Sequence, residues 1–574
     1  MVASAFARQV TELVDHELTA LLAMPPAETA DGTGHRTLMR QVKTAVLAYL
    51  NPASRWHRSA AALAQVPAWT AALKRRQGPD GLFSSAGNLA SPPDSSFTVN
   101  DLAVVHRLVS TAALPDATGN TDTLARLVPD LAQLMSASTP ALVTGGVHTA
   151  NHRWELAAAL AQLNTWRPDD VVRARADEWL AEGVDIATDG LYSERSPNYA
   201  ARVTNPCLIV LAEHLQRPDL LDVVHRNLHA HAALIDPAGL VETVHSRRQD
   251  QGQRFPAAPF ALQYRRFALL HGCPACAATA PLTESVTALE APDLQAQLLL
   301  EPALAEPLPR ATAPAATHGL HHFPSAGLVK VSDETSVVTI YGGSDVARVG
   351  RVASGLACDP TFLRWRQGRA VLDSLRLSRS FFGLGPFRSD GITVVPPGRQ
   401  GDQPSYRLQE QVSAAYYQPL SGDRRRGDGS YPLEFEGRFA SAMAFDCREG
   451  DEVRLETEIL VSTAERAVTV QAEFRGAETS YAFELAFWPG GVLEGVRSLA
   501  AADCYELVEG FGCYRVGTDT ITFGPGQGSA PERPPRYDPG ESYTFLHGTD
   551  AKSGPRVYVT GMTPGRCVLL LRAG

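Results

Sequence analysis

The spacing of apolar residues changes once along this chain, near residue 305, and this change limits the folds open to it. Before that point apolar residues recur every three or four positions, which is typical of amphipathic helices. After it they alternate with polar residues, which is typical of half-buried β-strands. A single core rarely spans 574 residues, so we expect two large domains, helical first and β second.

The helical half is punctuated by turns rich in Pro, Gly and Asp, such as residues 78–81. Many helices joined by short loops indicate stacked αα-hairpins, either in a solenoid or in a ring that closes on itself. No repeat of fixed period is present, which weighs against a regular solenoid. The expected helices are residues 3–24, 37–50, 55–76, 100–114, 122–135, 151–166, 171–184, 198–214, 218–234, 256–271 and 284–300.

The second half reads as an antiparallel β-sandwich, because alternating segments such as 335–341, 452–461 and 467–474 are separated by Gly and Asp turns. Residues 301–314, rich in Pro and Ala, form the best linker candidate. We therefore expect a helical domain over residues 1–305, a linker over 306–320 and an antiparallel β-sandwich domain over 321–574.

Charge excludes some classes of partner. With 52 Lys and Arg against 62 Asp and Glu, the formal net charge is −10, so a basic nucleic-acid binder is not expected, although an anionic substrate remains possible. Charges interrupt the first 24 residues, and no run of 18 apolar residues is free of charge. We therefore expect neither a signal peptide nor a membrane span, and a cytoplasmic location. No nucleotide-binding glycine motif is present, so no organic cofactor is implied.

Eight cysteines are sparse for this length and show no secreted disulfide framework. Cys273 and Cys276 form the only CxxC pair, beside His271. A four-ligand zinc site needs a second pair of ligands nearby, and none is evident in the sequence. We therefore expect isolated thiols and no metal.

One polar stretch, residues 145–155 with the sequence GGVHTANHRWE, leads directly into an apolar helix. Asn151, His152 and Glu155 are three or four positions apart, so they project from one side of the helix near its N-terminal end. An amide and an imidazole beside a helix N-terminus are suited to holding a carboxylate. The alternative is that Asn151 caps the helix while His152 and Glu155 form a surface pair, and spacing alone leaves both open.

The second stretch, residues 189–199, has the sequence DGLYSERSPNY. Asp189 and Gly190 mark a turn, and Ser196-Pro197 precedes the next helix, which places Tyr199 in its first turn. Taken alone, such a tyrosine is more simply a packed side chain with its hydroxyl in water.

Together, the two stretches resemble the helical domain of heparinase II/III-type polysaccharide lyases, to which alginate and oligoalginate lyases are related in build. The resemblance implies an incomplete (α/α) toroid followed by an antiparallel β-sandwich, and a carbon–oxygen lyase that cleaves uronic-acid-containing glycans by β-elimination. It implies that Asn151 neutralises the substrate carboxylate and that His152 neutralises or acts as base. Tyr199 would protonate the leaving oxygen and, in syn elimination, also remove the C5 proton.

The resemblance also suggests residues that bind an acidic poly- or oligosaccharide, and a cytoplasmic location favours short oligosaccharides and exolytic cleavage. Arg202 lies three residues beyond Tyr199, and Glu155 is suited to orienting the site. The predicted substrate-binding residues are Arg202, Glu155, His148, Tyr192, Arg364 and Arg366.

The second half departs from the family. Relatives often carry an H-x-H zinc cluster in the sandwich, but the comparable region, residues 355–379, has no histidine and several arginines. A solvated strand face explains most of these arginines, and one or two are placed to pair with a sugar carboxylate. His318, His321 and His322 are interpreted as linker histidines, since no carboxylate or cysteine lies at ligand spacing.

Two alternatives to a lyase remain. A glycoside hydrolase would use paired carboxylates, such as Glu155 with Asp189 or Glu194, at a separation that sequence does not show. A non-catalytic carbohydrate-binding protein is compatible with the same fold. No nucleic-acid or membrane partner is expected.

Overall fold

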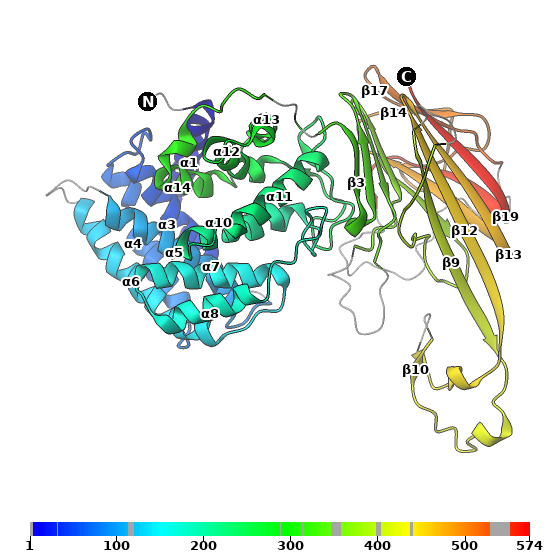
Figure 1. Cartoon of the computed structure of the whole chain (residues 1–574), viewed down its shortest axis with the longest axis horizontal. Coiled ribbons are helices and arrows are strands. Elements are labelled where there is room, and N and C mark those ends of the chain that lie inside the picture. The colour runs from blue at the N-terminus through cyan, green and yellow to red at the C-terminus, as the bar shows by residue number, and fades with distance from the viewer. Residues whose placement is uncertain are drawn as a thin grey trace. The chain divides into compact units, whose positions relative to one another are not determined.

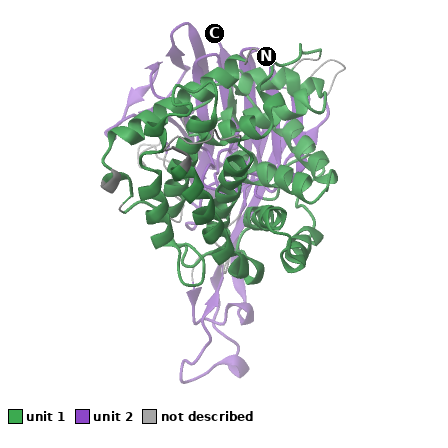
Figure 2. Ribbon diagram, turned by 90° about the vertical axis from the view of Figure 1, so that its left-hand side faces the viewer, with its two compact units in different colours: residues 1–193, 197–241, 255–316 green, residues 194–196, 242–254, 317–574 purple. Residues whose placement is uncertain are grey.

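The computed structural model describes residues 4–30, 32–85, 87–112, 120–287, 289–312, 315, 317–345, 357–397, 403–436, 440–528 and 552–574 (Figure 1). The chain divides into two compact units (Figure 2). The helical unit contains residues 1–193, 197–241 and 255–316, and the sheet unit contains residues 194–196, 242–254 and 317–574.

Helices dominate the first unit, as predicted, with a single two-residue ladder between β1 (Leu240–Val241) and β2 (Phe255–Pro256) in its described part. Local capping explains several helix starts: the Ser91 hydroxyl accepts a hydrogen bond from the Asp94 N–H at 3.2 Å, and the Asp169 carboxylate accepts from Val171 N–H at 2.8 Å. The helices are α1 Ala5–Ala23, α2 Pro26–Ala30, α3 His35–Leu50, α4 Val66–Arg76, α5 Pro92–Thr111, α6 Asn120–Thr144, α7 Ala150–Trp166, α8 Asp170–Ala181, α9 Pro197–Tyr199, α10 Asn205–His214, α11 Asp219–Leu234, α12 Ala261–Leu269, α13 Pro274–Thr283 and α14 Ala291–Leu300.

Some helix bounds differ from those expected, and two cases involve proline. Helix α5 begins at Pro92, earlier than predicted, because proline is favoured in a first turn. Helix α6 extends to Thr144, past the expected end at residue 135 and through Pro140, because its apolar face is buried along its length. Helix α13 was not among the helices expected from the sequence.

Neighbouring helices of the helical unit pack against one another in series. Helices α3, α5, α7 and α10 pack against one another in that order, while α4, α6, α8 and α11 pack on α3, α5, α7 and α10 respectively. The last helix, α14, packs against both α1 and α3, so the two ends of the series meet. No helix in the described ranges has the length and apolar character needed to cross a lipid bilayer.

One extended network of strands forms the sheet unit, in the order β14-β17-β18-β19-β13-β7-β6-β5-β4-β3, with β12 joining β13 to β9. Its pairs are antiparallel except β16 with β19. The alternation predicted for residues 467–474 is confirmed, since Val468, Val470 and Phe474 are at most 2% exposed. The strands are β3 Gly319–Phe323, β4 Leu328–Ser332, β5 Ser336–Tyr341, β6 Leu363–Gln367, β7 Ala370–Arg379, β8 Thr393–Val395, β9 Ser405–Tyr417, β10 Glu434–Phe435, β11 Ala440–Ser441, β12 Gly450–Ala464, β13 Ala467–Phe487, β14 Val492–Glu494, β15 Arg497–Ser498, β16 Cys504–Glu506, β17 Gly512–Val516, β18 Asp519–Gly524 and β19 Arg556–Ala573.

The chain passes between the two units more than once. The last change of unit falls between residues 316 and 317, within the predicted linker, of which positions 313, 314 and 316 lie outside the described residues. Residues 242–254 belong to the sheet unit because their charges pair there: Glu242 accepts from Arg364 at 2.7 Å. Burial alone would raise the pKa of Glu242, but Arg364 and a backbone N–H lower it to about 2.

Most arginines of β6 and β7 are not on a solvated face, which corrects the sequence interpretation. Arg376 lies opposite Glu484 of β13, with Nε to Oε1 at 2.9 Å, and both side chains are 2% exposed. Arg379 is likewise buried in an ion pair with Glu410 of β9. The reason is tertiary: each guanidinium meets a carboxylate from a distant strand, which makes burial of the charge tolerable.

Replacing Arg376 with Met should therefore destabilise the chain by about 3–5 kcal/mol, because Glu484 keeps its buried charge without a partner. Removing both charges, in Arg376→Met with Glu484→Leu, should recover most of that loss. Urea unfolding of the three proteins measures the effect. As a control, Arg454→Met removes an exposed pair with Glu452 and should cost less than about 1 kcal/mol. An Arg376→Met variant as stable as wild type would contradict the buried pair.

Candidate active site

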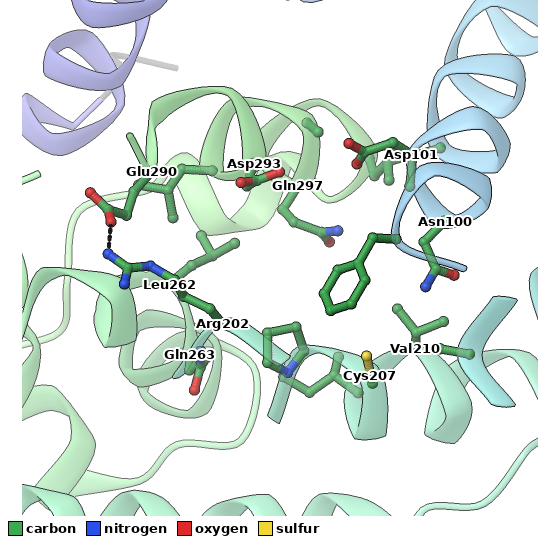
Figure 3. A pocket seen from close by; sticks show the side chains of 18 of the residues that line it. Asn100, Asp101, Arg202, Cys207, Val210, Leu262, Gln263, Glu290, Asp293 and Gln297 are labelled. Atoms are coloured by element: carbon green, nitrogen blue, oxygen red, sulfur yellow. Dashed lines mark hydrogen bonds and ion pairs between the residues drawn. The ribbon is translucent and has the colours of Figure 1, made fainter. Parts of the chain in front are cut away.

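A cavity of about 650 Å³ lies inside the helical unit (Figure 3). Its wall is formed by α3, α5, α7, α10, α12 and α14, together with the turn after α9. This volume is in the range of small-molecule sites. The charged residues of the wall are Arg36, Arg40, Lys43, Arg107, Arg202 and Arg266 on the positive side and Asp101, Glu155, Glu213, Glu290, Asp293 and Glu301 on the negative side.

Much of this charge is neutralised within the wall. Lys43 donates to Asp101 at 2.5 Å, and Arg266 pairs with Glu213 at 2.7 Å. Arg202, predicted to bind substrate, lines the cavity but pairs with Glu290, as the dashed line in Figure 3 shows. Its guanidinium also lies over the Phe255 ring, at 5.4 Å from the centroid. The cavity is therefore lined by ion pairs rather than by a uniformly positive surface.

The first turn of α7 carries the first predicted motif. Thr149 is the N-cap, so Asn151 is not the helix cap, and its side chain is 1% exposed. Asn151 Oδ1 accepts from the Thr149 hydroxyl at 2.7 Å, whereas Asn151 Nδ2 has no hydrogen-bond partner among the residues that the structure describes. A buried donor without a partner lowers the stability of the fold, and a ligand or an ordered water that accepts from it would remove this cost.

His152 lies in an aromatic group at the same end of α7. Its ring meets that of His148 edge-on, with centroids 4.7 Å apart, and that of Phe97 on α5 at 6.3 Å. The guanidinium of Arg36 lies over the ring of Phe97, 3.7 Å from its centroid. Arg36 and Phe97 line the cavity, so His148 and His152 are connected to its wall through Phe97.

Glu155 is buried, at 5% exposed, so the predicted alternative of a surface pair with His152 is wrong. Its carboxylate lines the cavity, accepting from Asn100 Nδ2 at 2.7 Å and from Cys207 Sγ at 3.1 Å. Burial raises the pKa of Glu155 to about 7, although the hydrogen bonds from Cys207 and Asn100 oppose the rise. A carboxyl with this pKa can exchange a proton near neutral pH.

The second motif ends at Tyr199, in the short helix α9. The π-helical turn Ala200–Thr204 that follows packs on α7. Tyr199 is half-buried, and the cavity wall includes Asn198 and Arg202 but not Tyr199. Single π-turns within helices occur often at functional sites. The segment that follows the second motif thus lies against α7, with the Cys207 thiol of α10 hydrogen-bonded to the Glu155 carboxylate of α7.

A buried polar network holds the π-turn in place. Gln263 Nε2 donates to the Ala201 carbonyl at 2.6 Å, and Asn205 Nδ2 donates to Gln263 Oε1 at 2.9 Å. The hydroxyl of Tyr192 donates to Asn205 Oδ1 at 2.7 Å, and Tyr192 is 6% exposed. Tyr192, predicted to contact substrate, therefore lies in the network that positions the turn.

Arg364 and Arg366, predicted to bind substrate, belong to β6 in the sheet unit. Arg364 is engaged with Glu242 and with Asp373, at 2.7 and 3.1 Å. Arg366 stacks on Trp488, 4.7 Å from the ring centroid. Both side chains have partners within their own unit, and their part in substrate binding stays a prediction.

Some residues of the site were missed from the sequence. No sequence motif marks Arg36, Phe97 or Cys207. They lie near α7 only because the helices that contain them pack around it. Asn100, the first residue of the expected helix 100–114, lies within α5 and donates a hydrogen bond to the Glu155 carboxylate. The adjacent Asn100 and Asp101 within an apolar helix were the available signal.

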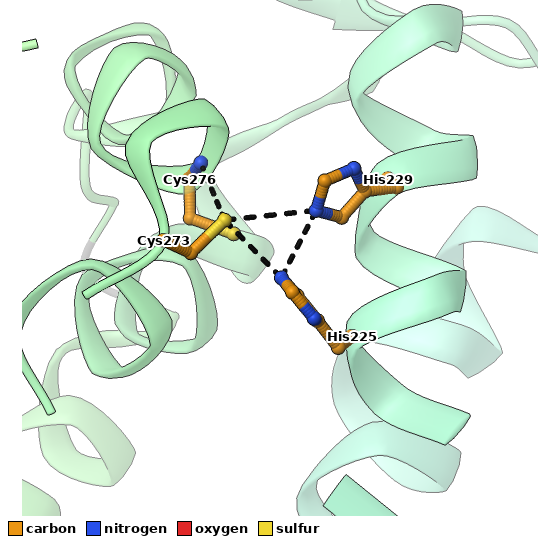
Figure 4. Close-up of side chains that lie close together, drawn as sticks. All are labelled: His225, His229, Cys273 and Cys276. Atoms are coloured by element: carbon orange, nitrogen blue, oxygen red, sulfur yellow. Dashed lines mark hydrogen bonds between the residues drawn. The ribbon is translucent and has the colours of Figure 1, made fainter. Parts of the chain in front are cut away.

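A second group of side chains is suited to holding a metal ion. His225 and His229 of α11 lie beside Cys273 and Cys276 at the start of α13 (Figure 4), with their ligand atoms all within 4.8 Å of one another. The expectation of isolated thiols is therefore wrong. The second pair of ligands comes from a helix more than forty residues earlier, which local spacing does not reveal. Within the described residues, this is the group with metal-ligand geometry.

No protein-family model and no curated protein matches this chain. Solved structures do match it in fold. Heparinase III matches 94% of this chain and 76% of its own length, with 11% sequence identity and a TM-score of 0.54. The Paenibacillus xanthan lyase matches 99% of this chain, with 11% identity and a TM-score of 0.53, and this chain spans 57% of its length. The predicted resemblance is confirmed at the level of the fold.

The buried Glu155 generates a prediction for stability against pH. Its pKa in the folded chain is about 7, above the usual 4.5, so its carboxyl favours folding fully below about pH 4.5 and loses that contribution as pH rises through 7. From about pH 5 to about pH 8, wild type should lose up to about 3 kcal/mol of unfolding free energy relative to Glu155→Gln.

Urea unfolding of wild type and Glu155→Gln across this range measures the difference. Glu178→Gln, which changes an exposed acid on α8, serves as the control and should follow wild type. Parallel pH profiles for wild type and Glu155→Gln would show that Glu155 does not titrate near neutrality.

Proposed function

We propose that this chain is a polysaccharide lyase that cleaves a uronic-acid-containing poly- or oligosaccharide by β-elimination. The observation that carries the proposal is the amide of Asn151, which is 1% exposed and whose Nδ2 has no partner among the described residues. A donor held in this way is suited to an acceptor that arrives with the substrate, and a carboxylate is the acceptor that β-elimination requires.

The chemistry explains why this donor matters. The C5 proton of a uronate becomes acidic only when the neighbouring carboxylate is neutralised, because the negative charge then spreads into an enolate-like intermediate. Asn151 lies in the first turn of α7, where the helix dipole and the first backbone N–H groups favour a negative group. Amide and helix terminus together would stabilise the charge that develops as the proton leaves.

His152 and Tyr199 are the proposed acid–base groups. His152 lies one residue from Asn151, in contact with the rings of His148 and Phe97. Tyr199 lies beside the π-turn that packs on α7. In this proposal Tyr199 donates a proton to the leaving O4, and either Tyr199 or His152 removes the C5 proton, depending on the stereochemistry of the sugar.

The comparisons support the same class of reaction. Heparinase III and the Paenibacillus xanthan lyase, whose folds this chain resembles, are lyases of polysaccharides by name. We also infer that the helical unit is an incomplete (α/α) toroid, because its first and last helices meet and its alternate helices line one cavity. The sheet unit is proposed to be the antiparallel β-sandwich that completes this architecture.

A glycoside hydrolase remains the second candidate, because Glu155 is a buried carboxyl with a pKa of about 7, as a general acid requires. The products distinguish the two reactions. Elimination creates a conjugated double bond that absorbs in the near ultraviolet, whereas hydrolysis creates new reducing ends without that absorbance.

We expect wild type to raise the near-ultraviolet absorbance of at least one substrate from a panel of alginate, glycosaminoglycans, glucuronan and acidic plant or bacterial gums. Asn151→Ala and Tyr199→Phe should each lower kcat/KM on that substrate by about 100-fold or more, since each removes a group needed in the transition state. Initial rates measured by absorbance test both variants.

Two matched variants serve as controls. Asn164→Ala changes an asparagine at the far end of α7, and Tyr416→Phe changes an exposed tyrosine of β9, and both should keep wild-type rates. Full activity in Tyr199→Phe would overturn the assigned acid–base role. New reducing ends without absorbance would favour the hydrolase, and binding of sugar without turnover would favour a carbohydrate-binding protein.

A further inference from the structure

We propose that His225, His229, Cys273 and Cys276 bind a structural zinc ion that ties helix α11 to helix α13. These side chains do not line the cavity of the helical unit, and the proposal does not depend on the function proposed above. Figure 4 shows the two imidazoles pointing from one helix toward the two thiols at the start of the other.

The distances between ligand atoms suit one small ion. His225 Nε2 lies 3.1 Å from Cys273 Sγ and 2.9 Å from His229 Nε2, and His229 Nε2 lies 3.6 Å from Cys273 Sγ. A tetrahedral zinc ion, with bonds of about 2.0–2.1 Å to nitrogen and about 2.3 Å to sulfur, separates its ligand atoms by about 3.3–3.8 Å. All four atoms lie within 4.8 Å of one another, so small rotations of the side chains would complete the tetrahedron.

Local structure sets both pairs of ligands. His225 and His229 are four residues apart on α11, so they project from one face of that helix. Cys273 is the N-cap of α13, with Pro274 in the first turn, and its Sγ accepts a hydrogen bond from the Cys276 N–H at 3.3 Å. Zinc binds cysteine as the thiolate, so binding of the ion would release the thiol protons.

The surroundings also fit a closed structural site. Cys273 and Cys276 are 8% and 1% exposed, whereas His229 is exposed and leaves a route for the ion. The ring of His225 stacks on Phe267 of α12, with centroids 4.8 Å apart and planes 5° apart, which holds the imidazole in one orientation. Two imidazoles and two thiols fill the four positions of a tetrahedral ion, so no position is left for a substrate.

A redox role for the CxxC pair is the main alternative. A disulfide between Cys273 and Cys276 would remove both sulfur ligands and give the paired histidines no function. Cys273 Sγ instead faces both imidazoles, 3.1 Å from His225 Nε2 and 3.6 Å from His229 Nε2, which is the arrangement of ligands around one ion. The geometry therefore favours the metal over the disulfide.

The test uses the full chain, expressed with zinc and purified with a non-chelating reductant. Elemental analysis should find about one zinc per chain. Exchange for Co²⁺ should give the visible absorption of a tetrahedral ion together with sulfur-to-cobalt charge transfer, as two thiolates and two imidazoles require. Cys273→Ser and His229→Ala should each lose most of the bound zinc and the cobalt spectrum.

The controls are Cys504→Ser, a buried thiol of the sheet unit, and His318→Ala, an exposed histidine, and both should keep one zinc. If the ligand variants fail to fold, wild type alone decides, because stripping its zinc with a chelator should lower the melting temperature and zinc should restore it. Wild type without zinc, a Cys273–Cys276 disulfide under these conditions, or zinc retained in both ligand variants would overturn the proposal.

Discussion

Polar groups buried among the inner helices must find partners, and this requirement organises the helical unit. Tyr192, Asn205 and Gln263 satisfy one another and the backbone of the π-turn, so that turn is held in a single position. Glu155 is satisfied by Asn100 and Cys207 from two other helices. These contacts fix α7 relative to the segment that carries the second motif.

Against that background, the Nδ2 of Asn151 is one of the buried polar atoms without a partner among the described residues. Asn151 lies one turn from Glu155 on the same helix, and both side chains are buried. A buried donor without a partner lowers the stability of the folded chain, and such groups are retained where they contribute to function. In the proposed function the Asn151 amide donates to the substrate carboxylate, and the N-terminus of α7 favours the same negatively charged ligand.

Two carboxyl groups, those of Glu155 and Glu242, show how far tertiary pairing changes the pKa of a side chain. Burial raises the pKa of Glu155 to about 7, whereas Arg364 and a backbone N–H lower that of Glu242 to about 2. The difference depends on whether a cation faces the carboxyl, since a charge is stable in the interior only beside an opposite charge. Arg364, the cation that faces Glu242, lies 122 positions away from it in the sequence.

The sequence by itself determined the helical and sheet halves, because the period of apolar residues dictates which face of an element can be buried. It also identified Asn151, His152 and Tyr199 as one candidate site, through two local motifs. Only the tertiary structure decided which side chains meet across elements. Arg376 became a buried ion-pair partner, and His225 joined Cys273, because such contacts depend on the packing of helices and strands that are distant in sequence.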